Sequence, residues 1–430
     1  MKLKRFTIEN YKALGHLDVC MDEDLLFLIG VNGAGKSSVL QALSLVRYFS
    51  EGATSAFFKD RDWKPTEARP KTTTVRGLRP AASRSRPKPP NLAITLGFDY
   101  DGVSVLWSFE WDYLDERTIA ESVWVWNSAN RRPRKIFALS ENPDDTDEAE
   151  DDEFQRSIRF LSSGEFELPG SILAVLRTRK IMARSRDREI LEQLRAWAGG
   201  ITLIDRLIPS SMRNIADVAS KDIGAQGQHL PAFIANLPSA AKNRVVDRVS
   251  DFYGIDGIDT VRKRSAWVDM RVAESFKLMG RVGIEHMSDG FLRILALCAI
   301  PEFGRDIGLV LLDEVEDGIE PHILPSLIER VASESRAQLV MTSHSPLLIN
   351  FFDQDQIYML GRAVSGHSIG ARASSLAPFR QGEDYFGSGE IWANADISVL
   401  GTALRRVRTP RRTISDAPTS REIMRYLGSE

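Results

Sequence analysis

Residues 25–37 read Leu25-Leu26-Phe27-Leu28-Ile29-Gly30-Val31-Asn32-Gly33-Ala34-Gly35-Lys36-Ser37. The first five are apolar without alternation, which predicts a strand that is buried on both faces of a sheet. The glycines that follow predict a tight loop, and beyond them Val39, Leu40, Leu43 and Val46 recur at helical spacing. This stretch therefore predicts a strand, a loop and a helix in direct succession.

The loop matches the pattern G-x-x-x-x-G-K-[ST], and it has the strand before it and the helix after it that this pattern requires. Glycines let backbone N–H groups surround a polyanion, and the start of a helix adds positive potential. Lys36 would reach the β and γ phosphates of a nucleotide, and Ser37 would bind Mg²⁺. We therefore expect nucleotide contacts from Gly30, Asn32, Gly33, Gly35, Lys36, Ser37 and Ser38.

A phosphate loop alone does not distinguish kinases, GTPases, transporters and DNA motors, so the second half of the chain matters. There, the apolar run 308–312 ends in Asp313 and Glu314. The carboxyl end of such a strand is where α/β sheets hold their ligands. We therefore expect Asp313 to support the magnesium shell, and Glu314 to orient and deprotonate the attacking water.

Two further motifs flank this strand. Upstream, Ser288-Asp289-Gly290 precedes the apolar helix expected over 292–300. By itself this is an ordinary helix N-cap, but its place between the phosphate loop and the carboxylate strand favours a second anion site. Downstream, the short apolar strand expected over 338–341 leads directly to His344.

Together these four motifs resemble the ABC-type P-loop ATPases, in particular the soluble branch that contains the SMC, RecF and OLD-like proteins. Residues 8–12, Ile-Glu-Asn-Tyr-Lys, are similar to the N-terminal strand motif of that branch. The resemblance implies ATP held between two chains, with Ser288 and Gly290 of one chain contacting the γ-phosphate in the phosphate loop of another. It also implies that His344 senses that phosphate, so that Glu314 and His344 are the catalytic candidates. The family's glutamine-bearing loop has no candidate, because no glutamine occurs between residues 49 and 154.

The fold that we expect is an α/β ATPase head with a mostly parallel core sheet, an antiparallel β subdomain and an inserted α-helical region. Residues 1–50 and 264–362 would form the split core, 51–263 the insertion, and 363–430 a C-terminal extension. Inside the insertion, the patterns predict a meander of strands over 92–98, 103–111, 122–126 and 135–139. They also predict helices over 186–197 and 240–252.

Composition excludes several classes of protein. The 430 residues contain 56 Lys and Arg against 59 Asp and Glu, and a net charge of −3 excludes a uniformly basic protein that coats nucleic acid. Only Cys20 and Cys298 occur, which excludes a disulfide framework and a cysteine-based zinc site. The chain has no apolar run long enough for a membrane span and no signal peptide at its start, so we expect a cytoplasmic protein without a membrane partner.

Three segments carry uneven charge. Ten basic and three acidic residues occupy 59–88, where the prolines argue against a regular element, and this segment either contacts nucleic acid or is a solubilising loop. Nine carboxylates occupy residues 141–153, which predicts a solvated loop. A second basic cluster for nucleic acid or an acidic partner consists of Arg405, Arg406, Arg408, Arg411 and Arg412.

The motifs and the resemblance lead to one functional hypothesis and two alternatives. The hypothesis is an ATPase subunit, using ATP and Mg²⁺, that forms a homodimer or a higher homo-oligomer when nucleotide binds. This assembly would control a nucleic-acid-directed process, and the resemblance to compact ATPases of anti-phage defence implies a separate effector such as a nuclease. The alternatives are the ATP-binding subunit of a transporter and an ATP-sensing oligomeric scaffold.

Overall fold

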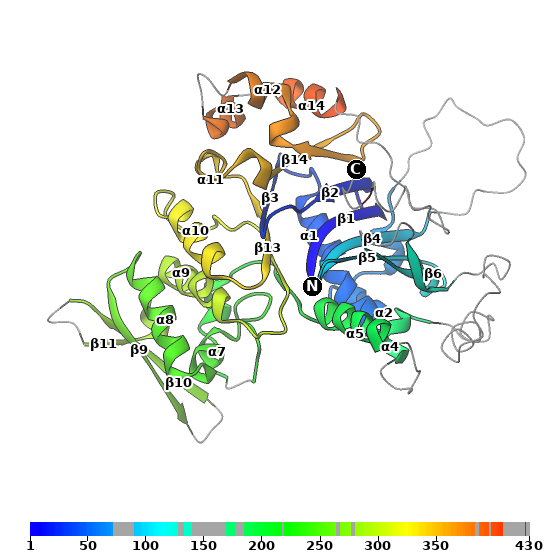
Figure 1. Cartoon of the computed structure of the whole chain (residues 1–430). Helices are drawn as coiled ribbons and strands as arrows, with labels where there is room; N and C mark the ends of the chain where they lie inside the picture. Colours follow the sequence, from blue (N-terminus) through cyan, green and yellow to red (C-terminus); the bar gives the residue numbers. More distant parts are fainter. Residues whose placement is uncertain are drawn as a thin grey trace, which may run out of the picture.

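The structure is a computed structural model of the whole chain, shown in Figure 1. It describes residues 1–71, 90–127, 133–139, 168–176, 185–216, 219–263, 267–276, 280–382, 387–394, 397–406 and 426. No helix within these ranges is both long enough and apolar enough to cross a membrane.

The core sheet is mostly parallel, as the sequence predicts. Its order is β15 (Ser368–Arg372), β14 (Ile357–Arg362), β3 (Leu25–Gly30), β13 (Gln338–Ser343), β12 (Leu309–Leu312) and β8 (Ile201–Ile204). All neighbours pair in parallel except β14 and β15, which form an antiparallel hairpin at one edge. Every residue of β3, β12 and β13 is buried, because layers of side chains cover both faces of the sheet.

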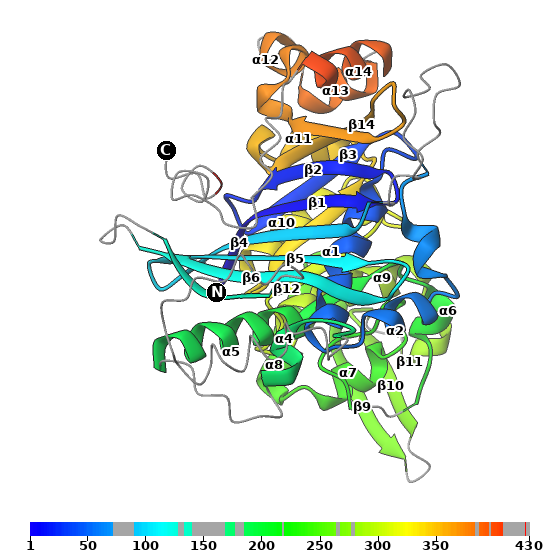
Figure 2. The ribbon, with the colours of Figure 1, turned by 90° about the vertical axis from the view of Figure 1, so that its right-hand side faces the viewer.

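A second, antiparallel sheet forms the β subdomain, and its strands lie side by side in Figure 2. Its order is β2 (Leu14–Cys20), β1 (Lys2–Tyr11), β4 (Leu92–Tyr100), β5 (Val103–Asp112), β6 (Arg117–Trp126) and β7 (Arg134–Leu139). The four-stranded meander is confirmed. However, β6 begins at Arg117, five residues before the predicted strand start at 122, because Arg117 and Thr118 still pair with the end of β5.

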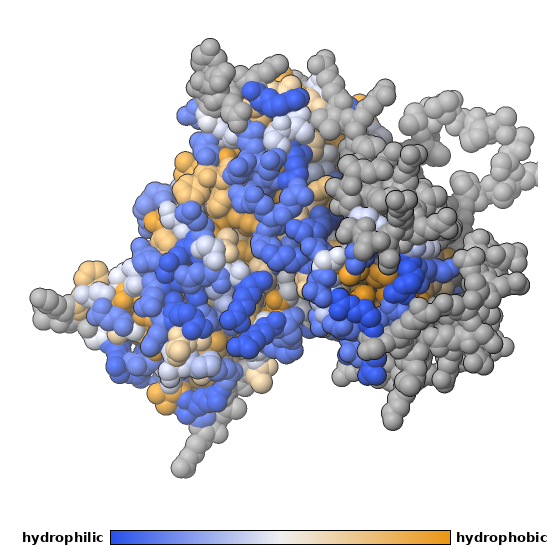
Figure 3. Space-filling model, in the orientation of Figure 1, coloured by the Kyte–Doolittle hydropathy of each residue, from blue (hydrophilic) through white to orange (hydrophobic). Residues whose placement is uncertain are grey.

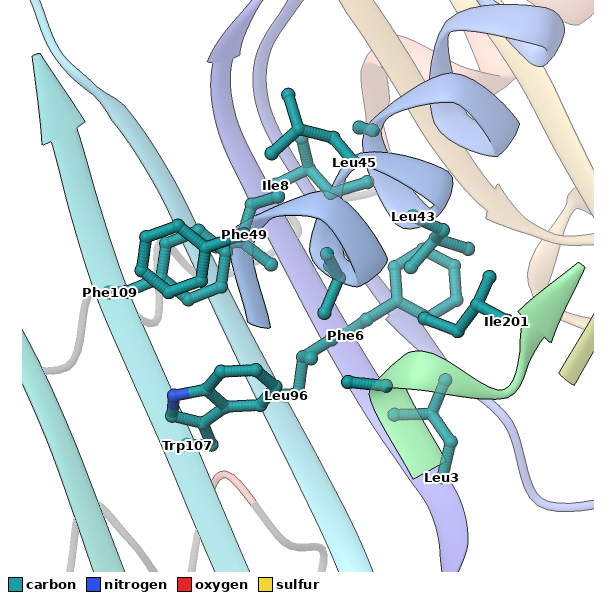
Figure 4. Packing of buried hydrophobic residues seen from close by; sticks show 14 of the residues in the cluster. Leu3, Phe6, Ile8, Leu43, Leu45, Phe49, Leu96, Trp107, Phe109 and Ile201 are labelled. Carbon is teal, nitrogen blue, oxygen red and sulfur yellow. The ribbon is translucent and has the colours of Figure 1, made fainter. Parts of the chain in front are cut away.

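Helix α1 (Lys36–Ser50) lies between these two sheets and is therefore buried on more than one face. Leu26 and Leu28 of β3 share one apolar cluster with α1 and the β subdomain, whereas Phe27 and Ile29 belong to the cluster on the opposite face of the core sheet. Figure 4 shows the first cluster, in which Phe49 of α1 stacks on Phe109 with ring centroids 3.7 Å apart. The helix that follows the phosphate loop is thus held from both sides.

A lobe of helices and a small sheet covers the opposite face. It contains α7 (Leu230–Asn236), α8 (Ser239–Ser250), β9 (Ile255–Lys263), β10 (Trp267–Glu274), β11 (Arg281–Gly283), α9 (Asp289–Ala299) and α10 (Leu324–Glu334). The buried Arg248 of α8 joins its helices, since it donates to the Cys298 carbonyl oxygen over 2.7 Å and to Glu334 over 2.6 Å.

The remaining elements are short, with the exception of α5. They are α2 (Thr54–Lys59), η1 (Pro65–Ala68), α4 (Ile172–Leu176), α5 (Ser185–Gly199), α6 (Pro209–Met212), η3 (Ile284–His286), η4 (Ile300–Glu302), α11 (Pro346–Phe351), η5 (Gln354–Gln356), η6 (Ala373–Ser375), α12 (Ala377–Gly382), α13 (Ser388–Asn394) and α14 (Ile397–Arg406).

Strand pairing crosses the domain boundaries that the sequence predicts. β8 belongs to the expected insertion and β15 to the expected C-terminal extension, yet both join the core sheet. In the basic segment 59–88, the expectation of no regular element is wrong at η1, because Pro65 occupies the first helical position, which tolerates proline. Residues 72–88, the acidic segment 141–153, and Arg408, Arg411 and Arg412 lie outside the described residues.

Glu121 of β6 is a fully buried carboxylate in the β subdomain. It accepts hydrogen bonds from the Trp107 indole over 2.9 Å, from the Ser171 hydroxyl over 2.5 Å and from the Ile172 backbone N–H over 2.7 Å. These donors oppose the effect of burial only in part, and burial raises the pKa of Glu121 to about 7. The folded state therefore binds a proton at Glu121 more tightly than the unfolded chain does.

We expect a pH-dependent stability that Glu121→Gln removes. A raised pKa means that the stabilising contribution is fully present below the unfolded pKa and is lost as pH rises through about 7. Urea unfolding from pH 5 to 8 should show the wild-type unfolding free energy falling by roughly 1–3 kcal/mol more than that of the variant. The exposed Glu192→Gln serves as control, and equal slopes for wild type and Glu121→Gln would contradict the assignment.

Candidate nucleotide-binding site

Four neighbouring parallel strands, β3, β13, β12 and β8, end at one edge of the core sheet. Their register places Ile29 opposite Ser343, Met341 opposite Leu312, and Leu312 opposite Ile204. The residues that follow these strands therefore meet at the carboxyl edge, where open α/β sheets bind ligands. The structure brings together here the phosphate loop, His344, the pair Asp313 and Glu314, and Asp205.

Two glycines of the phosphate loop have a left-handed backbone conformation. Gly33 and Gly35 have φ values of 75° and 106°, and such values favour glycine over other residues. Gly35 is the N-cap of α1 and supplies no side-chain cap, so the first N–H groups of the helix remain available to phosphate oxygens. Asn32 and Gly33 are exposed at the mouth of the loop, and Ser37 and Ser38 follow in the first turn of α1.

Lys36 folds back over this loop and is largely buried. Its ammonium group donates to the carbonyl oxygen of Gly30 over 2.9 Å. Burial lowers the pKa of Lys36, while the charges of Asp313, Glu316 and Glu314 act in the opposite direction. The cation therefore lies between the loop backbone and the carboxylates that follow β12.

The buried Thr342 at the end of β13 positions both residues of the carboxylate pair. Its hydroxyl donates to Asp313 Oδ1 over 2.5 Å and accepts the Glu314 backbone N–H over 2.8 Å. Glu314 has a φ of 51°, a left-handed conformation that residues with side chains rarely adopt, and this hydrogen bond stabilises it. Asp313 Oδ2 has no partner within the described ranges and remains available to a cation.

Glu316 is a carboxylate of this site that the sequence analysis missed. Its Oε1 accepts the backbone N–H of His344 over 2.5 Å, and its Oε2 is buried without a partner among the described residues. Burial and the charge of Lys36 lower the pKa of His344, which favours the neutral form of its imidazole. The carboxylate-rich run 313–316 is a sequence signal that could have indicated Glu316. Only the fold shows that Glu316 supports the loop that contains His344.

Asp205 is a second missed residue, and it follows the strand beside β12. Burial and the nearby charge of Asp313 raise the pKa of Asp205. Lys12 and Arg61 lie close enough to oppose this shift, and burial together with Arg61 lowers the pKa of Lys12 to about 8. Lys12 also donates to Gln41 over 2.7 Å and lies 3.6 Å from the ring centroid of Trp63. A charged cluster thus borders the site on the β8 side.

Ser288 and Gly290 are located at the start of α9, in the lobe that contains α7 and α8 (Figure 1). The Ser288 hydroxyl accepts the Phe291 backbone N–H over 3.2 Å, which is the N-cap interaction. Arg213 supports this turn by donating to the Met287 carbonyl oxygen over 2.7 Å. In the described part of the chain, no hydrogen bond or ion pair joins this turn to the phosphate loop.

The residues present fit Mg²⁺ when phosphate oxygens complete the shell. Ser37 supplies a hydroxyl oxygen and Asp313 a free carboxylate oxygen, which are the ligand types that Mg²⁺ prefers. Among all the described residues, those of this site included, no group of three or more His, Cys, Asp or Glu side chains could hold a metal ion. A cation at this edge would therefore depend on the nucleotide for its remaining ligands.

We expect Thr342→Val to impair the site more than Thr342→Ser does. Valine has the shape of threonine but neither donates to Asp313 nor accepts from Glu314, and the variant should lose about 1–3 kcal/mol of unfolding free energy. Displacement of the two carboxylates should lower ATP turnover roughly 10- to 100-fold. Urea unfolding and phosphate release measure these effects. Equal turnover by the two variants would show that the hydroxyl does not position the pair.

Comparisons with known proteins identify the family and the fold of this chain. A family model described as "AAA domain, putative AbiEii toxin, Type IV TA system" matches residues 25–350, which is more than half of the chain. A comparison with curated protein sequences gave no match. The structure is similar to an SMC head bound to the C-winged helix domain of ScpA, with a TM-score of 0.51 and 14% identity over 86% of this chain and 98% of that chain. It also matches the SMC head domain from Thermotoga maritima, with a TM-score of 0.44 and 12% identity over 86% of this chain and 99% of that chain. The chain thus has the fold of an SMC-type P-loop ATPase head and belongs to the AAA family that contains the AbiEii-type proteins.

Proposed function

We propose that this chain binds and hydrolyses ATP, and that ATP binding joins two copies into a dimer that controls a nucleic-acid-directed process. The observation that carries this proposal is the meeting of the phosphate loop, Asp313, Glu314 and His344 at one sheet edge. The loop supplies the phosphate cradle, and the carboxylates supply the metal and water contacts. A protein that binds nucleotide without hydrolysing it does not need carboxylates for contacts to the attacking water.

The chain's own residues account for the chemistry of hydrolysis. Lys36 and the first N–H groups of α1 bind the phosphates, while Ser37 and Asp313 would hold Mg²⁺. When bound, this cation neutralises charge that develops on the phosphate oxygens. Glu314 orients a water and accepts its proton, and neutral His344 donates a hydrogen bond to the γ-phosphate.

Ser288 supports the proposed dimer, because it has no bond to the phosphate loop of its own chain within the described ranges. A hydroxyl and the N–H groups at the start of α9 form a second anion site, and ATP can join this site to the loop of another copy. The surface around α11, immediately after His344, supports the same interpretation. Leu347 and Phe351 of this helix are 45% and 47% exposed, and Figure 3 shows apolar residues gathered there.

The family name and the structural relatives support a partner protein. The family description refers to a toxin of a type IV toxin–antitoxin system, and the similar SMC head was solved with a domain of ScpA. We therefore propose anti-phage defence in the cytoplasm, with a separately encoded effector such as a nuclease. A nuclease or toxin gene beside this one would support that role, whereas a gene for a multispanning membrane protein would favour the transporter alternative.

We expect Lys36→Ala to abolish measurable ATP binding. Without its ammonium group, the backbone cradle loses the charge that faces the β and γ phosphates. Isothermal titration calorimetry with Mg·ATP measures the loss, and Lys59→Ala, at the end of α2, is the matched control. An unchanged affinity of Lys36→Ala would show that the phosphate loop does not bind the phosphates of ATP as proposed.

We expect Glu314→Gln to bind ATP, to hydrolyse it at least about 100-fold more slowly, and to accumulate as an ATP-bound dimer. Light scattering after size-exclusion chromatography measures the dimer. Glu320→Gln, an exposed carboxylate on the following loop, should behave as wild type. Adding Ser288→Arg to Glu314→Gln should restore the monomer, because the new side chain blocks the second anion site. Undiminished turnover by Glu314→Gln would remove this residue from the role of base.

A further inference from the structure

The hairpin of β14 and β15 contacts the phosphate loop. In the sequence it lies beyond residue 350, where the segment matched by the family model ends. Arg362 of β14 donates through Nε to the carbonyl oxygen of Gly33 over 2.6 Å. Ser368 of β15 donates through its hydroxyl to the carbonyl oxygen of Ala34, also over 2.6 Å. Two side chains of one hairpin thus bind two successive carbonyl groups of the loop.

Strand register explains this contact. β14 is parallel to β3 and pairs Leu360 with Gly30, so that Arg362, two residues further, runs beside the loop that follows Gly30. Ser368 is the antiparallel partner of Arg362. The hairpin is therefore aligned with the phosphate loop by the same pairing that builds the core sheet.

Ser368 controls the direction of a backbone N–H in the cradle. In a planar trans peptide the C=O and N–H bonds point in opposite directions, so that anchoring the Ala34 carbonyl to Ser368 directs the Gly35 N–H to the other side. Ser368 is 1% exposed, and its hydroxyl lies 2.5 Å from the position that a Cβ on Gly35 would occupy. Ser368 is a positioning residue that the motif alone does not reveal.

Arg362 differs from Ser368 in two ways. It is exposed, and part of its guanidinium group is free to donate a further hydrogen bond. Its Nη1 donates to the Gly366 carbonyl oxygen over 2.5 Å, while its Nη2 has no partner within the described part of the chain. No carboxylate among the described residues pairs with its charge. Lys36 is buried beneath the loop, and Arg362 adds a second cation at the exposed side of Gly33. Guanidinium groups suit phosphate oxygens, because their donors are planar and always charged.

We propose that Arg362 is a further nucleotide-binding residue, which holds the Gly33 carbonyl and presents its free N–H group to the phosphates of ATP. This inference rests on the proposed ATP binding and extends the site to residues beyond the matched segment. Arg362 acts on binding rather than on the chemical step, since the carboxylates and His344 lie on other strands.

The test is calorimetric titration of Mg·ATP into four full-length variants and the wild type. Arg362→Ala should weaken ATP affinity roughly tenfold, while turnover at saturating ATP stays within about twofold. Arg372→Ala is the matched control: it belongs to the same hairpin but donates to the Cys20 carbonyl oxygen and to Asp22, away from the loop. It should bind ATP as wild type does.

Arg362→Lys and Arg362→Gln separate charge from loop positioning. Both side chains can donate to the Gly33 carbonyl, but only lysine retains the positive charge, so that Arg362→Lys should bind ATP more tightly. Added salt should reduce the difference between the two, because it screens an exposed charge. Equal affinities of the two variants would limit Arg362 to positioning the loop and overturn its contact with nucleotide.

The remaining outcomes distinguish this inference from the proposed function. If the wild type binds ATP and Arg362→Ala binds it equally well, the inference alone fails. If the wild type binds no ATP, the proposed function fails and the inference fails with it. Thermal unfolding of each variant confirms that it is folded, which we expect because Arg362 is an exposed residue.

Discussion

The parallel pairing of β13 with β3 on one side and with β12 on the other determines the geometry of the candidate site. These strands are buried on both faces, and a slip of one residue would turn every side chain to the opposite layer. The register therefore holds the ends of the strands at fixed separations. The phosphate loop, His344 and the carboxylate pair follow these strands, so the same register sets the distances between them. Thr342, at the end of β13, bridges to the neighbouring strand by hydrogen bonds to Asp313 and Glu314.

The rest of the molecule supports this edge from both faces. On one face, α1 packs between the core sheet and the β subdomain, which limits movement of the helix that begins the phosphate cradle. Gln338 joins the two sheets directly, because its side chain accepts the Leu3 backbone N–H over 2.7 Å and donates to the Leu3 carbonyl oxygen over 3.0 Å. On the other face, Arg248 binds the helices of the lobe into one unit that includes α9. Ser288 at the start of α9 therefore belongs to a well-supported element.

Charge within the site is distributed in a way that favours a bound polyanion with a cation. Asp313, Glu314 and Glu316 follow one strand, and Lys36 faces them from the phosphate loop. Lys12 and Arg61 border Asp205 on the β8 side, and Arg362 adds an exposed cation at the loop's outer side. Carboxylates that follow β12 and β8 thus lie close to Lys36, Lys12 and Arg61, which come from the start of the chain, while Arg362 comes from the β14–β15 hairpin.

Local patterns in the sequence were sufficient to predict the strand at 25–30, the phosphate loop, the helix after it, the carboxylate pair and the meander, since each depends on the periodicity or chemistry of adjacent residues. They were not sufficient to predict that Asp205, Glu316, Arg362 and Ser368 belong to or support the site. Each of these acts through a neighbouring strand or loop, and which strands become neighbours depends on the packing of the whole sheet. For the same reason, the sequence assigned β8 and β15 to regions outside the core. The sequence by itself determined the chemistry available to this protein, while the tertiary structure decided which groups meet, because side chains far apart in the chain come together only through strand register and burial.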